Sequence, residues 1–312
     1  MEYRNLGPSG LQVSAVGLGC NNFGGRIDLD QTLAVVNKAL DLGITLFDTA
    51  NIYGGQGKSE EFLGKALGSR RQDVVLATKF AGKMGDGPMQ SGASRRNIVS
   101  AVEASLRRLN TDYIDLYQVH FPDTATPIEE TLRALDDVVR AGKVRYIGHS
   151  NFAGWQIAEA EFTARAHNLT RFVSSQNEYS LLNRRVEAEV VPAARQYGLS
   201  ILPYFPLASG FLTGKYRQGE AKPEGTRLAA SPMADRLLTD KNFETLGRLE
   251  AFARERDHST LDLAIGWLAS KPYVGSVIAG ATKPEQLEQN VRAGEWRLNA
   301  DEMAEVDAIT KR

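Results

Sequence analysis

Four residues whose side chains can hold or transfer a proton follow short apolar runs of the chain, directly or within a few residues: Asp48, Tyr53, Lys79 and His120. A tyrosine is a weak acid with an ordinary pKa of ~10, and a nearby cation favours its phenolate. Lys79 can supply that cation, while Asp48 can pair with Lys79 and keep it charged. His120 can direct a carbonyl oxygen toward the phenol. The four side chains together are a candidate acid for the oxygen of a carbonyl group that receives a hydride.

Each of these residues taken singly also has an ordinary structural interpretation. A lysine after an apolar run usually marks a strand that leaves the core, and a lone histidine more often has a structural partner than a catalytic role. The chemical interpretation therefore requires a fold that brings the ends of several strands together.

The pattern of apolar residues predicts such a fold, because runs of strand length alternate with stretches of helical period. Continuous apolar strands that alternate with amphipathic helices indicate a parallel sheet covered by helices. Eight such units predict a (β/α)8 TIM barrel, in which catalytic groups project from the C-terminal ends of the strands. A doubly wound open sheet is the alternative architecture. The predicted strands are Ala15–Gly19, Thr45–Phe47, Val74–Thr78, Ile114–Val119, Val144–Gly148, Phe172–Ser175, Ser200–Pro203 and Gly275–Ala279.

The remaining segments are predicted to be additions to one barrel. An N-terminal β-hairpin is expected, since Tyr3–Leu6 and Leu11–Val13 flank a turn that contains two glycines. A long segment between residues 205 and 242 and an extra C-terminal helix over Asp301–Ile309 account for the surplus length. No Pro- or Ser-rich linker divides the chain, so residues 1–312 are predicted to form a single domain.

Three helix starts are predicted from capping patterns. Residues Thr126–Glu129 have the pattern of a capping box with proline in the first turn, and Ser259–Asp262 resemble a second such start. Thr282 with Glu285 predicts a third, whose free N–H groups and positive dipole end favour a phosphate.

Composition excludes several classes of function. With 37 Lys+Arg, 38 Asp+Glu and a formal net charge of −1, the chain has no overall basic field for nucleic acid or an anionic membrane. The single cysteine, Cys20, rules out an internal disulfide and a multi-cysteine zinc site, and no His-Glu-x-x-His pattern occurs, so no metal is expected. The longest apolar stretch is far shorter than the ~20 residues of a spanning helix, and the N-terminus lacks the apolar core of a signal peptide. A cytoplasmic location is expected.

Four segments together resemble the aldo-keto reductase superfamily, and the similarity extends from Leu6 to about Gly294. The closest likeness is to the branch of bacterial reductases and potassium-channel β subunits. The resemblance implies a barrel that reduces aldehydes and ketones with a nicotinamide cofactor, usually NADPH, and a catalytic tetrad of Asp48, Tyr53, Lys79 and His120. The segments are Asp48–Gly54 (DTANIYG), Ala77–Lys79 (ATK), Asp115–His120 (DLYQVH) and Gly148–Phe152 (GHSNF).

The resemblance also implies a set of cofactor contacts. Ser150, Asn151 and Gln176 resemble the residues that hold the nicotinamide carboxamide, and Tyr204 resembles the aromatic residue that stacks on the nicotinamide ring. Residues 205–215 resemble the loop that crosses the pyrophosphate, and residues 280–290 the segment at the adenosine end. The expected contacts are Cys20, Asn21, Asp48, Ser150, Asn151, Gln176, Tyr204, Phe205, Pro206, Leu207, Ala208, Ser209, Gly210, Leu212, Lys215, Arg227, Gly280, Thr282, Gln286, Gln289 and Asn290.

NADPH is expected in preference to NADH. The 2′-phosphate of NADPH carries about two negative charges and favours cationic, multidentate partners. Lys215, Arg227 and the helix start at Thr282 supply candidates, and no acidic residue stands at the aligned positions to hold a ribose 2′-hydroxyl. Gln286 occupies a position that is arginine in some branches. Arg227 has an alternative interpretation as a solvated surface arginine.

The expected substrate is a small molecule with a carbonyl group, and sugar, steroid, terpenoid and toxin carbonyls are all compatible with the sequence. Tyr53 and His120 are expected to contact the carbonyl oxygen. The remaining candidates can form an apolar wall, or can pack within their loops: Phe23, Phe80, Met84 and Phe121.

Two other classes of function compete with the reductase. A cofactor-binding regulatory subunit would sense redox state with little turnover, although the intact tetrad favours an enzyme. A hydrolase that uses Ser150 and His149 is disfavoured, because adjacent residues at a strand end point to opposite sides.

Overall fold

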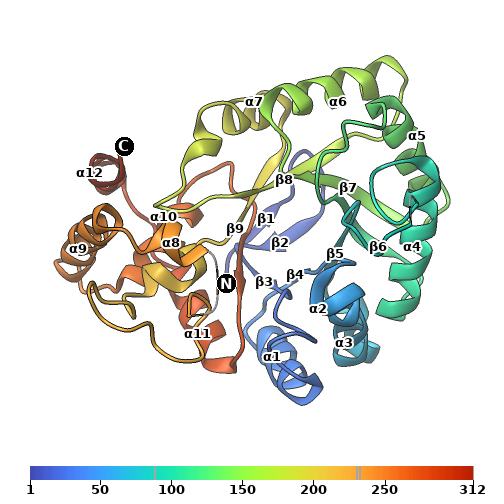
Figure 1. Ribbon diagram of the computed structural model, residues 1–312. Coiled ribbons are helices and arrows are strands. Elements are labelled where there is room, and N and C mark those ends of the chain that lie inside the picture. The colour runs from blue at the N-terminus through green and yellow to red at the C-terminus, as the bar shows by residue number, and fades with distance from the viewer. Residues whose placement is uncertain (88, 230, 232, 312) are drawn as a thin grey trace.

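The computed structural model describes residues 1–87, 89–229, 231 and 233–311, and its central feature is a closed barrel of eight parallel strands (Figure 1). The strand order around the barrel is β10-β3-β4-β5-β6-β7-β8-β9, so that β10 pairs with both β3 and β9 and closes the sheet. This closure confirms the predicted TIM barrel and excludes the open sheet. The barrel strands are β3 (Val16–Gly19), β4 (Leu46–Asp48), β5 (Val75–Phe80), β6 (Ile114–Val119), β7 (Val144–Ser150), β8 (Phe172–Glu178), β9 (Ser200–Tyr204) and β10 (Val277–Gly280).

All eight predicted strands are present, but six of them end later than predicted: β4, β9 and β10 by one residue, and three others by two or three. β5 extends to Phe80, β7 to Ser150 and β8 to Glu178. Their polar end residues stay in the parallel ladder, where Lys79 pairs with Gln118 and Ser150 pairs with Gln176. The sequence placed these polar side chains just beyond the strands, because a polar residue normally ends a buried run. At the C-terminal end of a barrel, however, polar side chains can point into the open interior while their backbone stays in the strand.

Helices surround the barrel (Figure 1). The helices are α1 (Leu29–Asp41), α2 (Tyr53–Gln56), α3 (Lys58–Leu67), α4 (Arg95–Leu109), α5 (Ile128–Arg140), α6 (Gly154–Ala166), α7 (Val190–Tyr197), α8 (Met233–Leu237), α9 (Asp240–Arg254), α10 (Thr260–Ala269), α11 (Pro284–Ala293) and α12 (Ala300–Thr310), with 3-10 turns η1 (Gly68–Asp73), η2 (Arg185–Glu187) and η3 (Ala208–Thr213). The segment after β9 lies on the left of the view with α8 and α9, where its apolar residues join the main core (Figure 1). None of the helices in the described part of the chain is long and apolar enough to cross a membrane.

The three predicted helix starts have different outcomes. The capping box of α10 is confirmed, with Ser259 and Asp262 bonded reciprocally. At α5 the prediction is wrong: the helix has no side-chain cap, because the Thr126 hydroxyl donates to Asp123 in the preceding loop. At α11 the helix begins at Pro284, and Gln286 instead of Glu285 accepts the backbone N–H of Lys283.

The predicted N-terminal hairpin, β1 (Tyr3–Asn5) and β2 (Gln12–Ser14), lies at the N-terminal end of the barrel. Leu6 and Val13 are fully buried and pack with residues of the barrel strands such as Leu46 and Leu116. The Gly7 N–H donates to the Ser200 hydroxyl at the start of β9. The hairpin therefore covers this end of the barrel, and the opposite end is left for the polar strand ends.

Candidate active site

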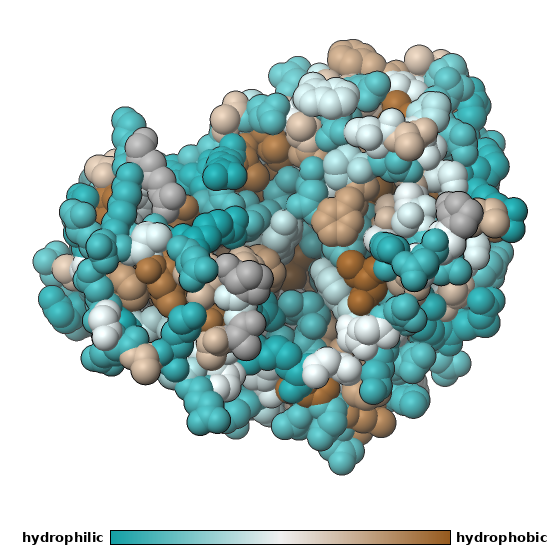
Figure 2. Space-filling view, in the orientation of Figure 1, coloured by the Kyte–Doolittle hydropathy of each residue, from teal (hydrophilic) through white to brown (hydrophobic). Residues whose placement is uncertain are grey.

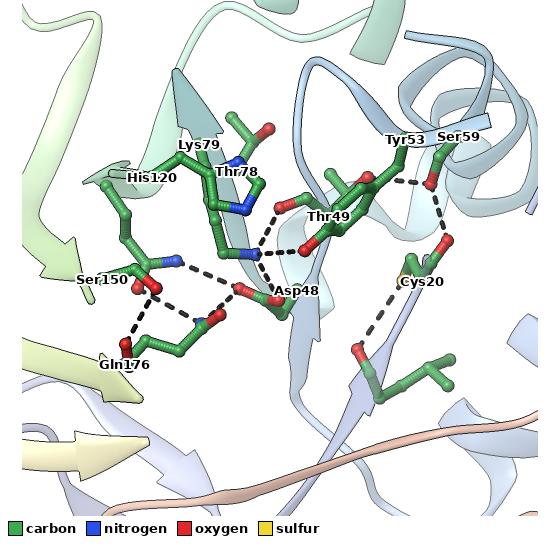
Figure 3. A network of polar contacts seen from close by, with 12 residues as sticks. Cys20, Asp48, Thr49, Tyr53, Ser59, Thr78, Lys79, His120, Ser150 and Gln176 are labelled. Carbon is green, nitrogen blue, oxygen red and sulfur yellow. Dashed lines mark hydrogen bonds and ion pairs between the residues drawn. The ribbon is translucent and has the colours of Figure 1, made fainter. Parts of the chain in front are cut away.

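The structure brings the four proton-handling residues together at the C-terminal ends of neighbouring strands (Figure 3). Asp48 is the last residue of β4, Tyr53 begins α2, Lys79 lies in β5 and His120 directly follows β6. Because these strands are adjacent in the barrel, their final residues converge although they are far apart in sequence.

Lys79 is the centre of the group, and its side chain is fully buried. Its Nζ donates to Asp48 Oδ2 at 2.6 Å, to the Thr49 carbonyl oxygen at 2.9 Å and to the Tyr53 hydroxyl oxygen at 3.5 Å. An ammonium group has three N–H bonds, so each has an acceptor. Burial by itself lowers the pKa of Lys79, but the Asp48 carboxylate and the Tyr53 oxygen outweigh it and raise the pKa above its ordinary value. Lys79 is therefore a cation at neutral pH.

Tyr53 holds its proton more firmly than the sequence suggested. Burial raises the pKa of its hydroxyl above the ordinary value, and this effect is larger than the opposing attraction of Lys79. The expectation that Lys79 favours the phenolate is thus outweighed by burial. The phenol is protonated at neutral pH, with a cation 3.5 Å away to stabilise the phenolate once the proton has left.

His120 lies beside the phenol as a neutral imidazole. Its ring makes an edge contact with Tyr53, with the centroids 5.6 Å apart, and it stacks on Phe121. Burial and the Lys79 charge lower the pKa of His120 to about 3. Its Nδ1 is buried and has no hydrogen-bond partner within the described chain. A neutral imidazole can orient a carbonyl oxygen by a hydrogen bond, but it is not a source of protons at neutral pH.

Asp48 is held on its second oxygen by two amides. Gln118 Nε2 donates to Asp48 Oδ1 at 3.0 Å, and Gln176 Nε2 donates to the same oxygen at 2.8 Å. Gln176 was expected as a cofactor contact only, and Gln118 was not predicted as a site residue. A signal for Gln118 does exist, because it stands two positions before His120 and strand side chains alternate with a period of two.

A cavity of about 1050 Å³ opens at this end of the barrel, and the tetrad residues Asp48, Tyr53 and His120 lie on its wall. Figure 2 shows a hollow near the centre of the molecular face, bordered by hydrophilic and hydrophobic residues. Ala208 and Leu212 are buried and are not among the residues that line the cavity. The other expected cofactor residues line it: Cys20, Asn21, Asp48, Ser150, Asn151, Gln176, Tyr204, Phe205, Pro206, Leu207, Ser209, Gly210, Lys215, Arg227, Gly280, Thr282, Gln286, Gln289 and Asn290.

The amide-bearing part of this wall is fixed by its own hydrogen bonds. The Ser150 hydroxyl donates to the Gln176 carbonyl oxygen at 2.8 Å, and the Tyr204 hydroxyl donates to Asn151 Oδ1 at 2.8 Å. Asn151 Nδ2 donates to the His120 carbonyl oxygen. These contacts join strands β6 to β9 and hold polar side chains and an aromatic ring beside the tetrad. A planar amide such as a carboxamide finds both donors and acceptors here.

The expected apolar substrate wall is largely absent. Phe23 and Phe80 are fully buried in the core, where Phe80 stacks on Tyr117, and neither lines the cavity. Met84 is half-buried and also lies outside the lining residues. The reason is that aromatic side chains at loop starts gain more by packing under their loops than by facing solvent. Phe121 alone of the four lines the cavity, and its side chain is 45% exposed.

Arg227 is not a solvated surface arginine, because it lies on the cavity wall. Its Nη2 donates to Asn22 Oδ1 at 2.8 Å, and its guanidinium lies over the Phe205 ring, 5.4 Å from the centroid. Asn22 in turn donates to the carbonyl oxygen of Ala281, directly before Thr282. Burial and the neighbouring Arg26 charge lower the pKa of Arg227. Asn22 and Arg26 also line this part of the cavity, although the sequence did not single them out as contacts.

The start of α11 differs from the expected open phosphate site. Gln286 Oε1 accepts the backbone N–H groups of Thr282 at 2.8 Å and Lys283 at 3.3 Å. The donors that were expected to be free for a phosphate therefore have a side-chain acceptor. Lys283 and Arg292 line the same end of the cavity and add positive charge to it.

The structure is a closed (β/α)8 barrel with an Asp–Lys–Tyr–His cluster at the C-terminal ends of its strands, and comparison with known proteins shows the family to which it belongs. Residues 15–311 match the aldo/keto reductase family, so the chain belongs to that family. A probable voltage-gated potassium channel β subunit of Oryza sativa subsp. japonica is 41% identical over 302 residues, which are 94% of this chain and 91% of that protein. The uncharacterized oxidoreductase YrpG of Bacillus subtilis is 40% identical over 96% of this chain and 93% of its own length.

Relatives with named reductase activities are somewhat less similar. The L-glyceraldehyde 3-phosphate reductase of Escherichia coli O157:H7 is 34% identical over 320 residues, which cover 98% of this chain and 92% of that protein. Family membership and such relatives support a general assignment of the chain as an oxidoreductase that reduces carbonyl groups.

Proposed function

We propose that the protein reduces aldehydes or ketones to alcohols with NADPH, and that Tyr53 is the general acid. The observation that carries this proposal is the position of Lys79 Nζ, which bridges Asp48 Oδ2 and the Tyr53 oxygen at the wall of the large cavity. A protonated phenol beside a buried cation is suited to give a proton and to remain as a stabilised phenolate.

The residues on the cavity wall fit a nicotinamide dinucleotide. Gln176, Ser150 and Asn151 would hold the carboxamide, Tyr204 would pack on the ring, and Lys215 would face the phosphates. The bound cofactor supplies a hydride to the carbonyl carbon. A cavity of about 1050 Å³ is at the upper end of the ~300–1,000 Å³ range of ligand sites, as a long ligand requires.

The chain's own residues would handle the carbonyl oxygen. The neutral His120 imidazole would hold the oxygen by a hydrogen bond beside the Tyr53 hydroxyl. As the oxygen gains negative charge, the Tyr53 proton moves to it and an alcohol is formed. Lys79 stabilises the phenolate that results, and Asp48 keeps Lys79 charged.

The charges around the cavity support a preference for NADPH over NADH. Arg26, Lys215, Arg227, Lys283 and Arg292 line it, whereas the acidic lining residues of the described chain are Asp48 and Glu224. Asp48 is neutralised by Lys79, so the field over the adenosine end is positive. A phosphate with about two negative charges gains from such a field.

Initial-rate assays of the purified protein with NADPH and a panel of aldehydes and ketones test the proposal. We expect turnover with an activated aldehyde such as a nitrobenzaldehyde, and little turnover by Tyr53→Phe with the same cofactor affinity. Absence of turnover with every carbonyl, despite tight cofactor binding, would instead support a redox-sensing regulatory subunit. The similarity to the rice channel β subunit is the observation that favours this second candidate.

A further inference from the structure

Gln118 is a buried polar residue that touches the catalytic cluster but not the cavity. Its side chain belongs to a fully buried residue of β6 and is not among the residues that line the cavity. Its amide donates to Asp48 Oδ1 at 3.0 Å, from the side of the carboxylate opposite Lys79. Gln118 therefore does not contact a ligand in the cavity, and a substitution of Gln118 can change the reaction only through Asp48.

Gln176 shares the same carboxylate oxygen but is differently placed. It lines the cavity, and its Nε2 donates to Asp48 Oδ1 at 2.8 Å and to Gln118 Oε1 at 3.4 Å. The two amides come from β6 and β8, which are separated by β7, so they meet across the lumen. A ligand amide in the cavity can compete for Gln176, whereas Gln118 lies beyond its reach.

We propose that Gln118 is a positioning residue that fixes the orientation of the Asp48 carboxylate. Asp48 in turn holds the Lys79 ammonium group beside the Tyr53 hydroxyl, while Gln176 binds the cofactor. This inference rests on the proposed function of the site. An ionised carboxylate accepts hydrogen bonds only, and a buried one requires donors on both oxygens. With Gln118 in place, Oδ1 keeps one donor whatever Gln176 does.

Displacement of Asp48 would act on Lys79, because Asp48 is the negative charge that faces it. The other titratable groups around Lys79 are Cys20 at the end of β3, Tyr53 at the start of α2 and His120 after β6. Burial raises the pKa of Cys20 and Tyr53, and burial lowers that of His120 to about 3, so all three are neutral near pH 7. No other described group replaces Asp48 as the counter-ion.

The main test compares Gln118→Met, which keeps the length of the side chain but has no N–H donor, with Tyr117→Phe as a matched control. Tyr117 is the neighbouring residue of the same strand, is fully buried, and its hydroxyl has no hydrogen-bond partner within the described chain. Gln118→Met should bind NADPH within about 3-fold of wild type and lose roughly 10-fold or more in kcat. The alkaline limb of its pH–rate profile should move to lower pH, because the raised pKa of Lys79 depends on Asp48. Tyr117→Phe should resemble wild type in all three measurements.

A second readout uses the protein without cofactor. Since the folded-state pKa of Lys79 is raised, its ion pair stabilises the fold below the ordinary lysine pKa, and this stability is lost as pH rises through the folded value. The fall in urea midpoint should begin near the ordinary lysine pKa in all three proteins, but in Gln118→Met it should be smaller and should end at lower pH than in wild type and Tyr117→Phe. This measurement tests the role of Gln118 without any enzyme activity. If the wild-type protein reduced no carbonyl compound, that result would count against the proposed function but not against the role of Gln118.

Gln118→Glu gives the sharpest outcome. A deprotonated carboxylate beside Asp48 repels it, whereas a protonated carboxyl donates to it as the amide does. Activity of this variant should be low at neutral pH and should recover partly as pH falls, a pattern that a packing defect does not produce. An unshifted alkaline limb and an unshifted urea profile in Gln118→Met, or a pH-independent defect in Gln118→Glu, would overturn the positioning role.

Discussion

The two ends of the cavity are built in different ways. At the tetrad end, Asp48, Lys79 and Gln118 belong to strands, are buried, and form hydrogen bonds of 2.6 and 3.0 Å. At the other end, the cavity-lining residues Lys215 and Lys283 belong to connecting segments and are exposed. Charges that are buried and paired interact strongly, whereas exposed charges are screened by water and salt. We therefore expect substitutions at the tetrad end to change the rate of reaction steeply, and those at the other end to change cofactor affinity moderately.

The largest effect is expected for Tyr53→Phe, which removes the proton donor and keeps most of the packing. The kcat for carbonyl reduction should fall by ~100-fold or more, within the usual range for general acid catalysis, while the Kd for NADPH stays nearly unchanged. Steady-state kinetics and fluorescence titration measure the two quantities. Turnover like that of wild type would refute the assignment of the acid.

Lys79→Met should come next. Without Lys79 the pKa of Tyr53, which burial already raises, rises further, so the phenolate left by proton transfer is destabilised and kcat falls by roughly 30- to 100-fold. Asp48→Asn should be milder, because it weakens the charge on Lys79 without removing it. Both variants break a buried pair, and losing one partner should cost about 3–5 kcal/mol in the free energy of unfolding. If Lys79→Met were fully active at neutral pH, the coupled tetrad would be wrong.

Arg227→Ala should have an intermediate effect, because Arg227 is half-buried and hydrogen-bonded to Asn22, and its exposure lies between that of the buried tetrad and that of the exposed lysines. Loss of a charged hydrogen-bond partner should weaken NADPH binding by ~1–3 kcal/mol and barely alter NADH binding. Titration of both cofactors into both proteins decides the matter. Equal affinities of wild type for NADH and NADPH would contradict the preference, and equal weakening of both would place Arg227 away from the 2′-phosphate.

The smallest effect is expected for Lys215→Ala. Lys215 is exposed, and its Nζ lies beside Gly210, whose φ of +89° is a backbone conformation that side chains disfavour. A screened surface charge should contribute about two- to five-fold in cofactor affinity, less at high salt. Binding titrations over a range of NaCl concentrations measure it, with Lys222→Ala, an exposed lysine that does not line the cavity, as the control. A loss as large as that of Arg227→Ala would mean that the two ends of the cavity do not differ.

Much of the tetrad end could be predicted from the sequence. Apolar runs of strand length fixed the eight strands, and parallel strands in a closed barrel bring their C-terminal residues to one place, so Asp48, Lys79 and His120 had to meet. Backbone period and strand polarity are local properties that a sequence expresses directly.

The contacts of several side chains could be known only from the tertiary structure. Gln118 donates to Asp48, which is 70 residues away, and Phe23 and Phe80 pack in the core instead of facing the cavity. Thr126 bonds Asp123 instead of capping α5, and Arg227 reaches Asn22, 205 residues distant. The reason is that a hydrogen-bond partner or a packing partner is chosen among segments that only the closed barrel brings together. A local pattern sets the conformation of the backbone, while the neighbours of a side chain are set by the fold.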